Sequence, residues 1–274
     1  QWIPSILENA GVSGILVLVW INGLMAIGRQ FAGAGQRRER FGRPAQRGQR
    51  HAEVGERLDR LRRAFHRRRK TACCLFMAPL LEIARRYGLK VIEDAAHALG
   101  ARYDGRVLGS HSAFVMFSLQ AIKHMTTVDG GMLTCADASL LPKGRRLRWF
   151  GIDRHAPRTE VDVSETGFKY HMNNVNATIG LAQLEVIQPL LDRHCANGRY
   201  LDAALAGVSG LEVCQFEDRA APSYWFYTVL CDDPDGLSKH LAAHGIASSK
   251  AHKRNDQHSV FASSRRELPG IDRF

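Results

Sequence analysis

The feature that most constrains this chain is an alternation of helical and strand patterns that follows its first quarter. Aliphatic residues recur at helical spacing in residues 80–84, and Gly88 is placed to end that helix. Residues 89–92 then predict a short buried strand, and residues 113–117 and 131–135 predict two more. Helices that alternate with buried strands are typical of an α/β fold with a largely parallel sheet.

Two further helices are predicted beyond these strands. Residues 138–148 favour a short helix, and residues 176–191 carry apolar side chains on one face for nearly four turns. Asn173 or Asn174 is available to cap the longer helix, and Pro189 lies near its expected end. A long amphipathic helix of this kind gives the chain an apolar face to bury.

The pattern changes again near residue 197, which indicates a second domain. A helix is followed by a strand at residues 225–230 and by another helix at residues 236–244. We therefore expect the core of a large α/β domain at residues 71–195 and a smaller α+β domain at residues 196–274.

The first 70 residues differ in composition from the rest of the chain. Residues 1–70 hold 15 Lys and Arg against 5 Asp and Glu, so they carry nearly all of the formal net charge of +11. Between residues 37 and 70 the chain is rich in Arg, Gln and Gly. We interpret residues 1–70 as disordered or foreign to the fold. A basic arm that binds nucleic acid is not favoured, because only Phe41 and Phe65 interleave with the basic residues of this stretch.

Compartment and metal binding are constrained by the cysteines and by one apolar run. The six cysteines form no CxxC pair and have no zinc-like spacing to histidine, so we expect reduced thiols, a cytoplasmic protein and no metal site. Residues 12–27 are apolar, but they are few for a bilayer span and include Asn22. A membrane association is therefore not expected.

Residues that can carry chemistry follow two of the predicted strands. Asp94 and His97 come after the first strand, in EDAAHALG, whereas Ser118 ends the second and Lys123 follows it, in FSLQAIKHMTT. In an open α/β sheet, ligands bind beyond the carboxyl ends of the strands. A carboxylate there can keep a pyridinium nitrogen protonated, and an amine with a lowered pKa can form an imine with an aldehyde.

Each of these residues also has a simpler interpretation. Taken alone, Asp94 is more often a helix cap or turn residue, and His97 is more often a loop histidine with its hydrogen bonds satisfied. A lone lysine such as Lys123 is usually solvated surface, and the glycine pair 130–131 is an ordinary turn. The order and joint spacing of the set favour the functional interpretation.

These segments together resemble the DegT and StrS type of nucleotide-sugar aminotransferase, a branch of the aspartate aminotransferase superfamily. The match rests on EDAAH, on FS placed five residues before Lys123, on the TT pair and on the following GG turn. It continues through RWFGIDR, GFKYHMNNVNATIGLAQLE, YWFYTVL and HGIASSKAHKRNDQHSVF. The resemblance covers roughly residues 73–274.

The resemblance implies a transferase fold of type I, incomplete here, and pyridoxal 5'-phosphate as cofactor. It implies that Lys123 forms the Schiff base with the cofactor and later moves the proton. Asp94 would pair with the pyridinium nitrogen, His97 would lie against the ring or its phenolic oxygen, and Ser118 would bind the phosphate.

Further roles are implied for polar residues nearer the C-terminus. In related chains a polar residue near residues 167–174 reaches the phosphate across a dimer. The candidates for that role are Lys169, His171 and Asn173, with Asn173 counted among the cofactor-binding residues. The positions that resemble substrate-binding ones are His252, Arg254 and Asn255.

The implied activity is transfer of an amino group from an amino acid, most simply glutamate, to a nucleotide-linked keto sugar by a homodimer. A related dehydratase branch has histidine in place of the lysine, and the retention of Lys123 favours transamination although His124 is its neighbour. Residues 1–70 show neither the glycine-threonine phosphate loop nor the stacking aromatic residue of the family. The missing strands would leave one side of the sheet unpaired. The alternative is therefore a truncated or frameshifted member without activity.

Overall fold

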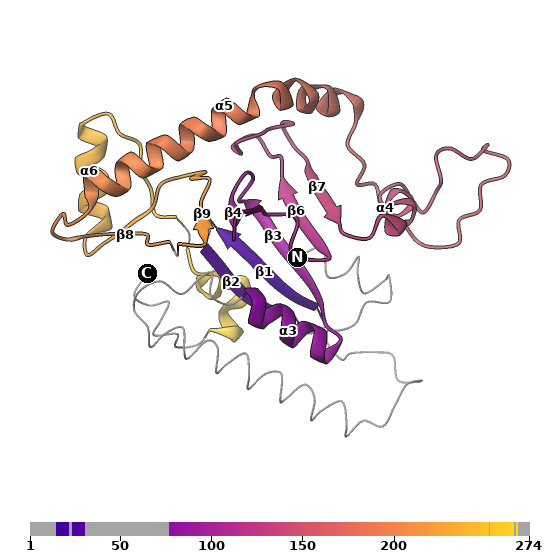
Figure 1. The fold of residues 1–274 in the computed structure, drawn as a ribbon, viewed down its shortest axis with the longest axis horizontal. Coiled ribbons are helices and arrows are strands. Elements are labelled where there is room, and N and C mark those ends of the chain that lie inside the picture. Colours follow the sequence, from indigo (N-terminus) through magenta and orange to yellow (C-terminus); the bar gives the residue numbers. More distant parts are fainter. Residues whose placement is uncertain are drawn as a thin grey trace.

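The computed structural model describes residues 15–21, 24–30, 77–216, 218–251, 253–265 and 267. Its main body is one five-stranded sheet with helices around it (Figure 1). The elements are, in chain order, β1 (Ile15–Ile21), β2 (Leu24–Gln30), α3 (Met77–Tyr87), β3 (Lys90–His97), β4 (Arg102–Tyr103), β5 (Arg106–Val107), β6 (Phe114–Ser118), β7 (Gly131–Cys135), η1 (Ala138–Leu140), α4 (Leu141–Leu147), α5 (Asn174–Leu205), β8 (Leu211–Val213), β9 (Ala220–Ala221), β10 (Val229–Cys231), α6 (Pro234–Ala243), η2 (Asn255–Gln257) and η3 (Ser259–Ser264).

The strands of the main sheet run in the order β2-β1-β3-β6-β7. β3 is parallel to β1 and to β6, whereas β2 and β7 are antiparallel to their neighbours at the two edges. Asp94 of β3 pairs with Met116 of β6, so Ser118 lies just beyond this pair along β6. The carboxyl ends of β3 and β6 therefore meet at one edge of the sheet, as the sequence predicts.

β3 is the most buried of the strands β3 to β10. Val91, Ile92, Glu93 and Ala95 in this strand are all buried, and Ile92 and Ala95 are fully so. A run of consecutive buried residues is expected when a parallel strand is covered on both faces. Ala84 of α3 belongs to the same apolar cluster, which fixes that helix against the sheet. The predicted helix before Gly88 and the strand after it are thus confirmed.

The structure differs from our expectation for two stretches inside residues 1–70. β1 and β2 lie in this segment, and β1 pairs with β3 over most of its length. β3 is therefore paired on both sides, with β1 on the side where we expected strands to be missing. The apolar run at residues 12–27, which we weighed as a membrane segment, contributes most of these two strands. The rest of residues 1–70 lies outside the described residues.

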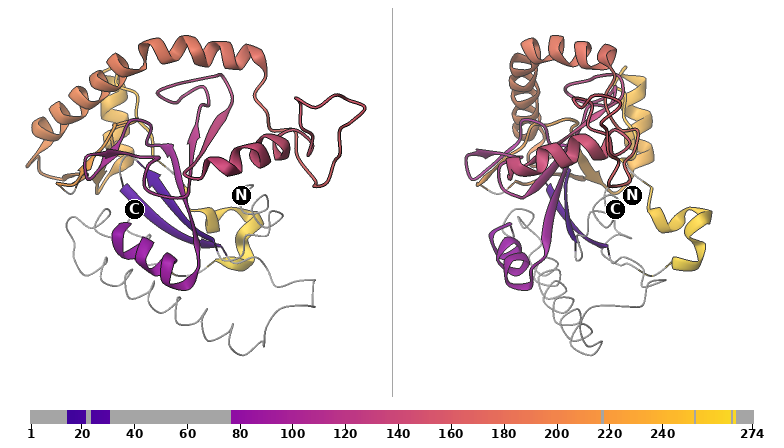
Figure 2. Two further views of the ribbon diagram at one scale, coloured as in Figure 1. Left: turned by 45° about the vertical axis from the view of Figure 1, so that its right-hand side comes forward. Right: turned by 90° about the vertical axis from the view of Figure 1, so that its right-hand side faces the viewer.

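α5 is longer than the sequence predicts. The Asn173 side chain accepts a hydrogen bond from the Asn176 backbone N–H, which confirms the predicted cap. The helix continues past Pro189 to Leu205, so the expectation that it ends near Pro189 is wrong. A proline in a helix removes one backbone hydrogen bond, and here the freed carbonyl belongs to the exposed Glu185, where water can satisfy it. Figure 2 shows α5 curving over the upper end of the sheet.

The C-terminal part of the chain is built from short elements. β8 and β10 form a two-stranded antiparallel sheet, and α6 starts at Pro234 with Asp233 as its N-cap. β9 pairs with β4, which ties this part to the hairpin of β4 and β5. The predicted strand at residues 225–230 is confirmed only at its end, since Trp225 lies in a loop before β10. No helix among the described residues is long and apolar enough to cross a membrane.

Candidate active site

The loop after β6 carries Lys123 back over the edge of the sheet. Its backbone N–H donates to the carbonyl of Gln120 at 2.9 Å, which forms a tight turn. The Lys123 ammonium nitrogen lies 3.7 Å from the centre of the Trp225 ring. The Trp225 indole N–H donates to the carbonyl of Ile122 at 2.7 Å, so the indole is fixed to the same loop. The Trp225 indole therefore covers the amine of the candidate catalytic lysine.

Asp94 and His97 reach this place from the end of β3. The His97 ring stacks on Trp225 with ring centres 4.1 Å apart and an angle of 29° between the planes. The Asp94 carboxylate accepts a hydrogen bond from the backbone N–H of Ala96 at 3.1 Å, which orients it at the strand end. One indole thus contacts both the predicted histidine and the predicted lysine.

The environment of Lys123 lowers the pKa of its amine. Burial is the main cause, because it disfavours the charged form, and the nearby Asp94 carboxylate opposes the shift. A lowered pKa increases the fraction of neutral amine, which is the nucleophilic form. The Asp94 carboxylate therefore lies near enough to Lys123 to affect the pKa of its amine.

The neighbouring His124 has a different environment. It is buried, and its ring meets that of His194 on α5 edge to face, with ring centres 4.5 Å apart. Burial and, second, the His194 ring lower the pKa of His124 to about 4. A neutral His124 packed against α5 is a structural neighbour of the lysine, which agrees with Lys123 as the reactive residue.

The segment after Lys123 is a compact turn that closes the loop. The Thr127 backbone N–H donates to the Leu119 carbonyl at 2.8 Å, and its hydroxyl donates to the Asp129 carbonyl at 2.9 Å. Gly130 has a φ of 154°, and a Cβ there would lie 2.5 Å from the Thr127 hydroxyl oxygen. The Asn176 side-chain amide donates to the same Asp129 carbonyl at 2.9 Å, so α5 holds the turn. The geometry of this turn therefore explains the second threonine of the TT pair and the first glycine of the GG pair.

Ser118 ends β6 with its hydroxyl at the edge of the sheet. That oxygen accepts a long hydrogen bond of 3.4 Å from the backbone N–H of Gln120. A serine hydroxyl at a strand end is suited to bind an anionic oxygen. The location agrees with the predicted phosphate contact, which stays a prediction.

The three candidates for a contact across a dimer lie in the segment just before α5. The Lys169 amine lies within hydrogen-bonding distance of His171, with Nζ 3.0 Å from Nδ1. The His171 ring meets the Trp149 ring edge to face, with ring centres 4.0 Å apart. The Asn173 side-chain oxygen is used as the cap of α5. Among the described residues no contact joins this group to Ser118. Its role in a second protomer's site stays a prediction.

The predicted substrate-binding residues are not brought to Lys123 by any described contact. Arg254 forms an ion pair with Asp256, with nitrogen to oxygen distances of 2.9 Å and 2.5 Å, and Asn255 begins η2. His252 lies outside the described residues. The aromatic residues near Lys123 were missed as site residues by the sequence interpretation. Their signal was the YWFY run at residues 224–227, which was interpreted as a strand.

The donor set of the cluster fits pyridoxal 5'-phosphate by its chemistry. It offers an amine with a lowered pKa, a carboxylate, a ring that can lie against another ring, and a hydroxyl at a strand end. Among the described residues, no group of three or more His, Cys, Asp or Glu side chains is placed to hold a metal ion. The site can thus hold a cofactor through covalent, ionic and stacking contacts.

Comparison with known proteins gives the same family that the motifs indicate. The profile of the DegT/DnrJ/EryC1/StrS aminotransferase family matches residues 56–270. Aminotransferases of this family depend on pyridoxal 5'-phosphate. The match begins before the described helix α3 and covers the whole of the candidate site.

Two curated relatives and one solved structure show the extent of the similarity. GDP-perosamine synthase of Caulobacter vibrioides is 39% identical over 63% of this chain and 47% of its own length. UDP-4-amino-4-deoxy-L-arabinose--oxoglutarate aminotransferase of Shewanella sediminis is 35% identical over 57% of this chain and 42% of its own length. The sugar aminotransferase CalS13 of Micromonospora echinospora is 38% identical, with a TM-score of 0.67 over 72% of this chain and 54% of that chain. The chain thus spans about half the length of the proteins it matches.

Proposed function

We propose that this chain, which belongs to the DegT/DnrJ/EryC1/StrS aminotransferase family, transfers an amino group from an amino acid to a nucleotide-linked keto sugar with pyridoxal 5'-phosphate. The observation that carries the proposal is the cluster at the carboxyl ends of β3 and β6. There the Lys123 amine is partly buried beneath Trp225, with Asp94 close enough to affect its pKa.

The bound cofactor supplies an electron sink for the carbon that loses and gains a proton. Lys123 binds the cofactor and moves that proton between donor and acceptor atoms, which its lowered pKa favours. Asp94 holds a proton on the ring nitrogen by offering a carboxylate to it. His97 packs against one side of the cofactor ring, and Ser118 binds the cofactor phosphate. Each role is a proposal that the positions of these side chains support.

The names of the relatives support the choice of substrates. One relative is named for a UDP-linked aminosugar and oxoglutarate, and the other for a GDP-linked aminosugar. Oxoglutarate is the keto acid that glutamate becomes when it gives up its amino group. We therefore propose glutamate as amino donor and a nucleotide-linked keto sugar as acceptor, in a cytoplasmic enzyme whose Cys135, Cys195, Cys214 and Cys231 are free thiols.

The test is an assay of the purified chain with pyridoxal 5'-phosphate, glutamate and a panel of UDP-linked and GDP-linked keto sugars. Formation of 2-oxoglutarate that depends on the sugar would support the proposal, and mass spectrometry would identify the aminosugar. Ping-pong kinetics are expected, because one lysine serves both half-reactions. Lack of turnover with every sugar, in a folded chain that retains no cofactor, would favour the alternative of an inactive family member.

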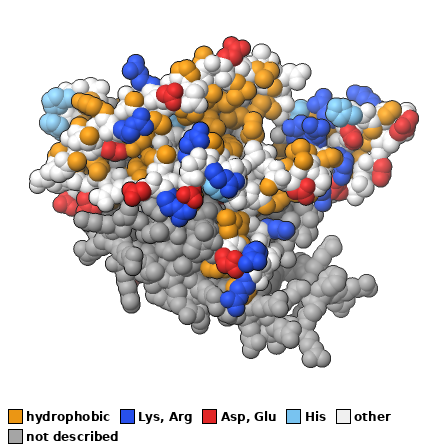
Figure 3. All heavy atoms as spheres, in the orientation of Figure 1, with side chains coloured by type: hydrophobic (Ala, Val, Ile, Leu, Met, Phe, Trp, Pro, Cys, Tyr) orange, Lys and Arg blue, Asp and Glu red, His pale blue; other side chains and the backbone are white. Residues whose placement is uncertain are grey.

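A homodimer is the assembly we propose for this enzyme. The support is the apolar surface of α5, where Val175 and Leu181 are 70% and 66% exposed and Leu184 and Val186 are 55% exposed. Figure 3 shows hydrophobic side chains gathered over the region of α5. Exposed apolar patches of this kind are typical of protein interfaces.

Leu181→Glu is expected to weaken the dimer by about tenfold or more, because a charge would be buried at the proposed interface. Sedimentation velocity over a range of concentrations measures the effect. Val208→Glu, in the turn after α5, is the matched control and should leave the dimer unchanged. A wild-type chain that stays monomeric at every concentration would contradict the proposed assembly.

A further inference from the structure

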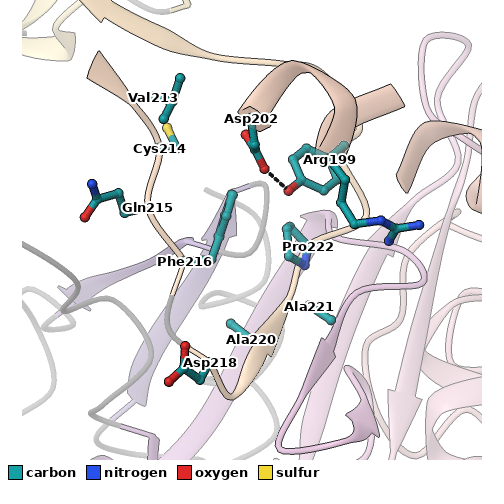
Figure 4. Close-up of a pocket in the computed structure, with 11 residues that line it drawn as sticks. Arg199, Asp202, Val213, Cys214, Gln215, Phe216, Asp218, Ala220, Ala221 and Pro222 are labelled. Atoms are coloured by element: carbon teal, nitrogen blue, oxygen red, sulfur yellow. Dashed lines mark hydrogen bonds between the residues drawn. The ribbon is translucent and has the colours of Figure 1, made fainter. Parts of the chain in front are cut away.

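Asp202, near the end of α5, accepts hydrogen bonds from two tyrosines of the same aromatic run. Tyr224 donates to one carboxylate oxygen of Asp202, and Tyr227 donates to the other at 2.8 Å. Figure 4 shows the Asp202 carboxylate joined to a tyrosine hydroxyl at a pocket of about 580 Å³. One carboxylate therefore fixes both ends of the segment formed by residues 224–227.

The two hydroxyls stay protonated and able to donate. Burial raises the pKa of Tyr224 and of Tyr227, and the hydrogen bonds to Asp202 raise both further. Charge-assisted hydrogen bonds of this type are stronger than bonds between neutral groups. The Asp202 carboxylate is thus a firm anchor for the aromatic segment.

The same half of α5 contacts this segment at other points. Nδ1 of His194 lies 3.1 Å from the carbonyl oxygen of Tyr224. The Cys195 thiol donates to the carbonyl oxygen of Pro222 at 3.5 Å. A Cβ at Gly198 would overlap the Tyr224 ring, so glycine is required for the ring to lie on the helix. The segment is therefore held along its length and not only by its hydroxyls.

The segment held in this way carries the cover of the candidate lysine. Trp225 lies between the two tyrosines, stacks on His97 and lies over the Lys123 ammonium. His194 also packs against His124, the residue that follows Lys123. α5 thus contacts both the cover and the loop of the lysine.

We propose that Asp202 is a positioning residue for transamination: by holding Tyr224 and Tyr227 it keeps Trp225 against His97 and over Lys123. This inference rests on the proposed function, but it concerns a residue outside the cofactor-binding set. Asp202 touches neither Lys123 nor Asp94 in any described contact, so it acts through Trp225. Loss of this anchor releases the indole and exposes the amine to water.

The test compares Asp202→Ala and the double variant Tyr224→Phe/Tyr227→Phe with the wild-type chain. Tyr200→Phe, on the same helix and 72% exposed, is the matched control. The pH dependence of Lys123 labelling by an amine-reactive anhydride is measured by mass spectrometry of its peptide, without added cofactor. Quenching of Trp225 by acrylamide is measured alongside, with the Trp225→Phe chain as the background.

In both test variants the labelling pKa of Lys123 is expected to rise toward the ordinary lysine value, because burial is the main cause that lowers it. The Asp94 carboxylate, which opposes that shift, stays in place. Trp225 should be quenched more readily, and kcat with glutamate should fall about tenfold to a hundredfold, as expected for a misplaced catalytic group. Asp202→Asn should restore part of each signal, since its amide can still accept a hydrogen bond.

An unchanged labelling pKa of Lys123 and unchanged quenching of Trp225 in the folded double variant would overturn the proposal. The double variant keeps the aromatic rings at positions 224 and 227, so its result decides the test if Asp202→Ala fails to fold. Neither readout needs pyridoxal 5'-phosphate. A wild-type chain that retains no cofactor would therefore refute the proposed function, while the role of Asp202 would be decided by its own two measurements.

Discussion

Lys123→Ala is expected to abolish covalent retention of pyridoxal 5'-phosphate and to lower kcat by about 10⁴-fold or more. The physical reason is that this amine is both the covalent anchor and the proposed proton carrier, and general acid–base catalysis alone contributes roughly 10²-fold to 10⁴-fold. Borohydride reduction, followed by peptide mapping, measures where the cofactor is attached. Single-turnover assays measure the loss of rate.

Two variants separate the chemistry of Lys123 from its packing. Lys123→Arg keeps a cation that can lie over Trp225, yet its guanidinium stays protonated, so activity should be lost without loss of folding. Lys143 follows β7 in the chain, whereas Lys123 precedes it, and Lys143 forms an ion pair with Glu165. Lys143→Ala should therefore leave the cofactor bound. Label on Lys90, Lys143 or Lys169 in the wild-type chain would contradict the assignment.

Local patterns predicted the elements whose side chains alternate or repeat clearly. The strand at residues 131–135 is observed as β7 with the same bounds, and the helix before Gly88 is observed as α3. Gly88 has a φ of 64°, which a glycine adopts without strain at the end of a helix. Where periodicity and a terminating residue agree, the sequence alone locates an element.

Contacts between distant segments could not be predicted in the same way. β1 was missed because its apolar run is followed by Arg-rich sequence, and its pairing with β3 spans a large sequence separation. The helix end was predicted too early, near Pro189, because proline weakens a helix locally. α5 continues because it is held by contacts at Asn176, His194 and Asp202. Tertiary contacts therefore decided both cases.

The residues of the candidate site also differ in whether local sequence or a distant contact places them. Asp94, His97 and Lys123 could be predicted because each has a fixed place relative to a strand end. Trp225 could not be, since its role depends on a loop that crosses from the C-terminal part to the lysine. Arg254 forms an ion pair with Asp256, and its expected contact with substrate stays a prediction. Residue type and spacing identify reactive groups better than the groups that position them.

Asp94→Asn is expected to keep part of the bound cofactor and to lower kcat by about a hundredfold or more. The neutral amide cannot hold a proton on the ring nitrogen as a carboxylate does, so the electron sink is weakened. The same change removes the charge that raises the pKa of Lys123, so that pKa should fall further below the ordinary value. The direction is opposite to the one expected for Asp202→Ala.

Two measurements check this expectation, and they do not depend on each other. Steady-state kinetics with glutamate give the loss of kcat, and anhydride labelling of Lys123 across pH gives the shift without added cofactor. Asp162→Asn, an exposed carboxylate far from β3 in the chain, is the matched control and should change neither. Near-normal turnover of Asp94→Asn would remove this carboxylate from the ring nitrogen. A labelling pKa of Lys123 equal to that of the wild-type chain would show that the two side chains do not share one site.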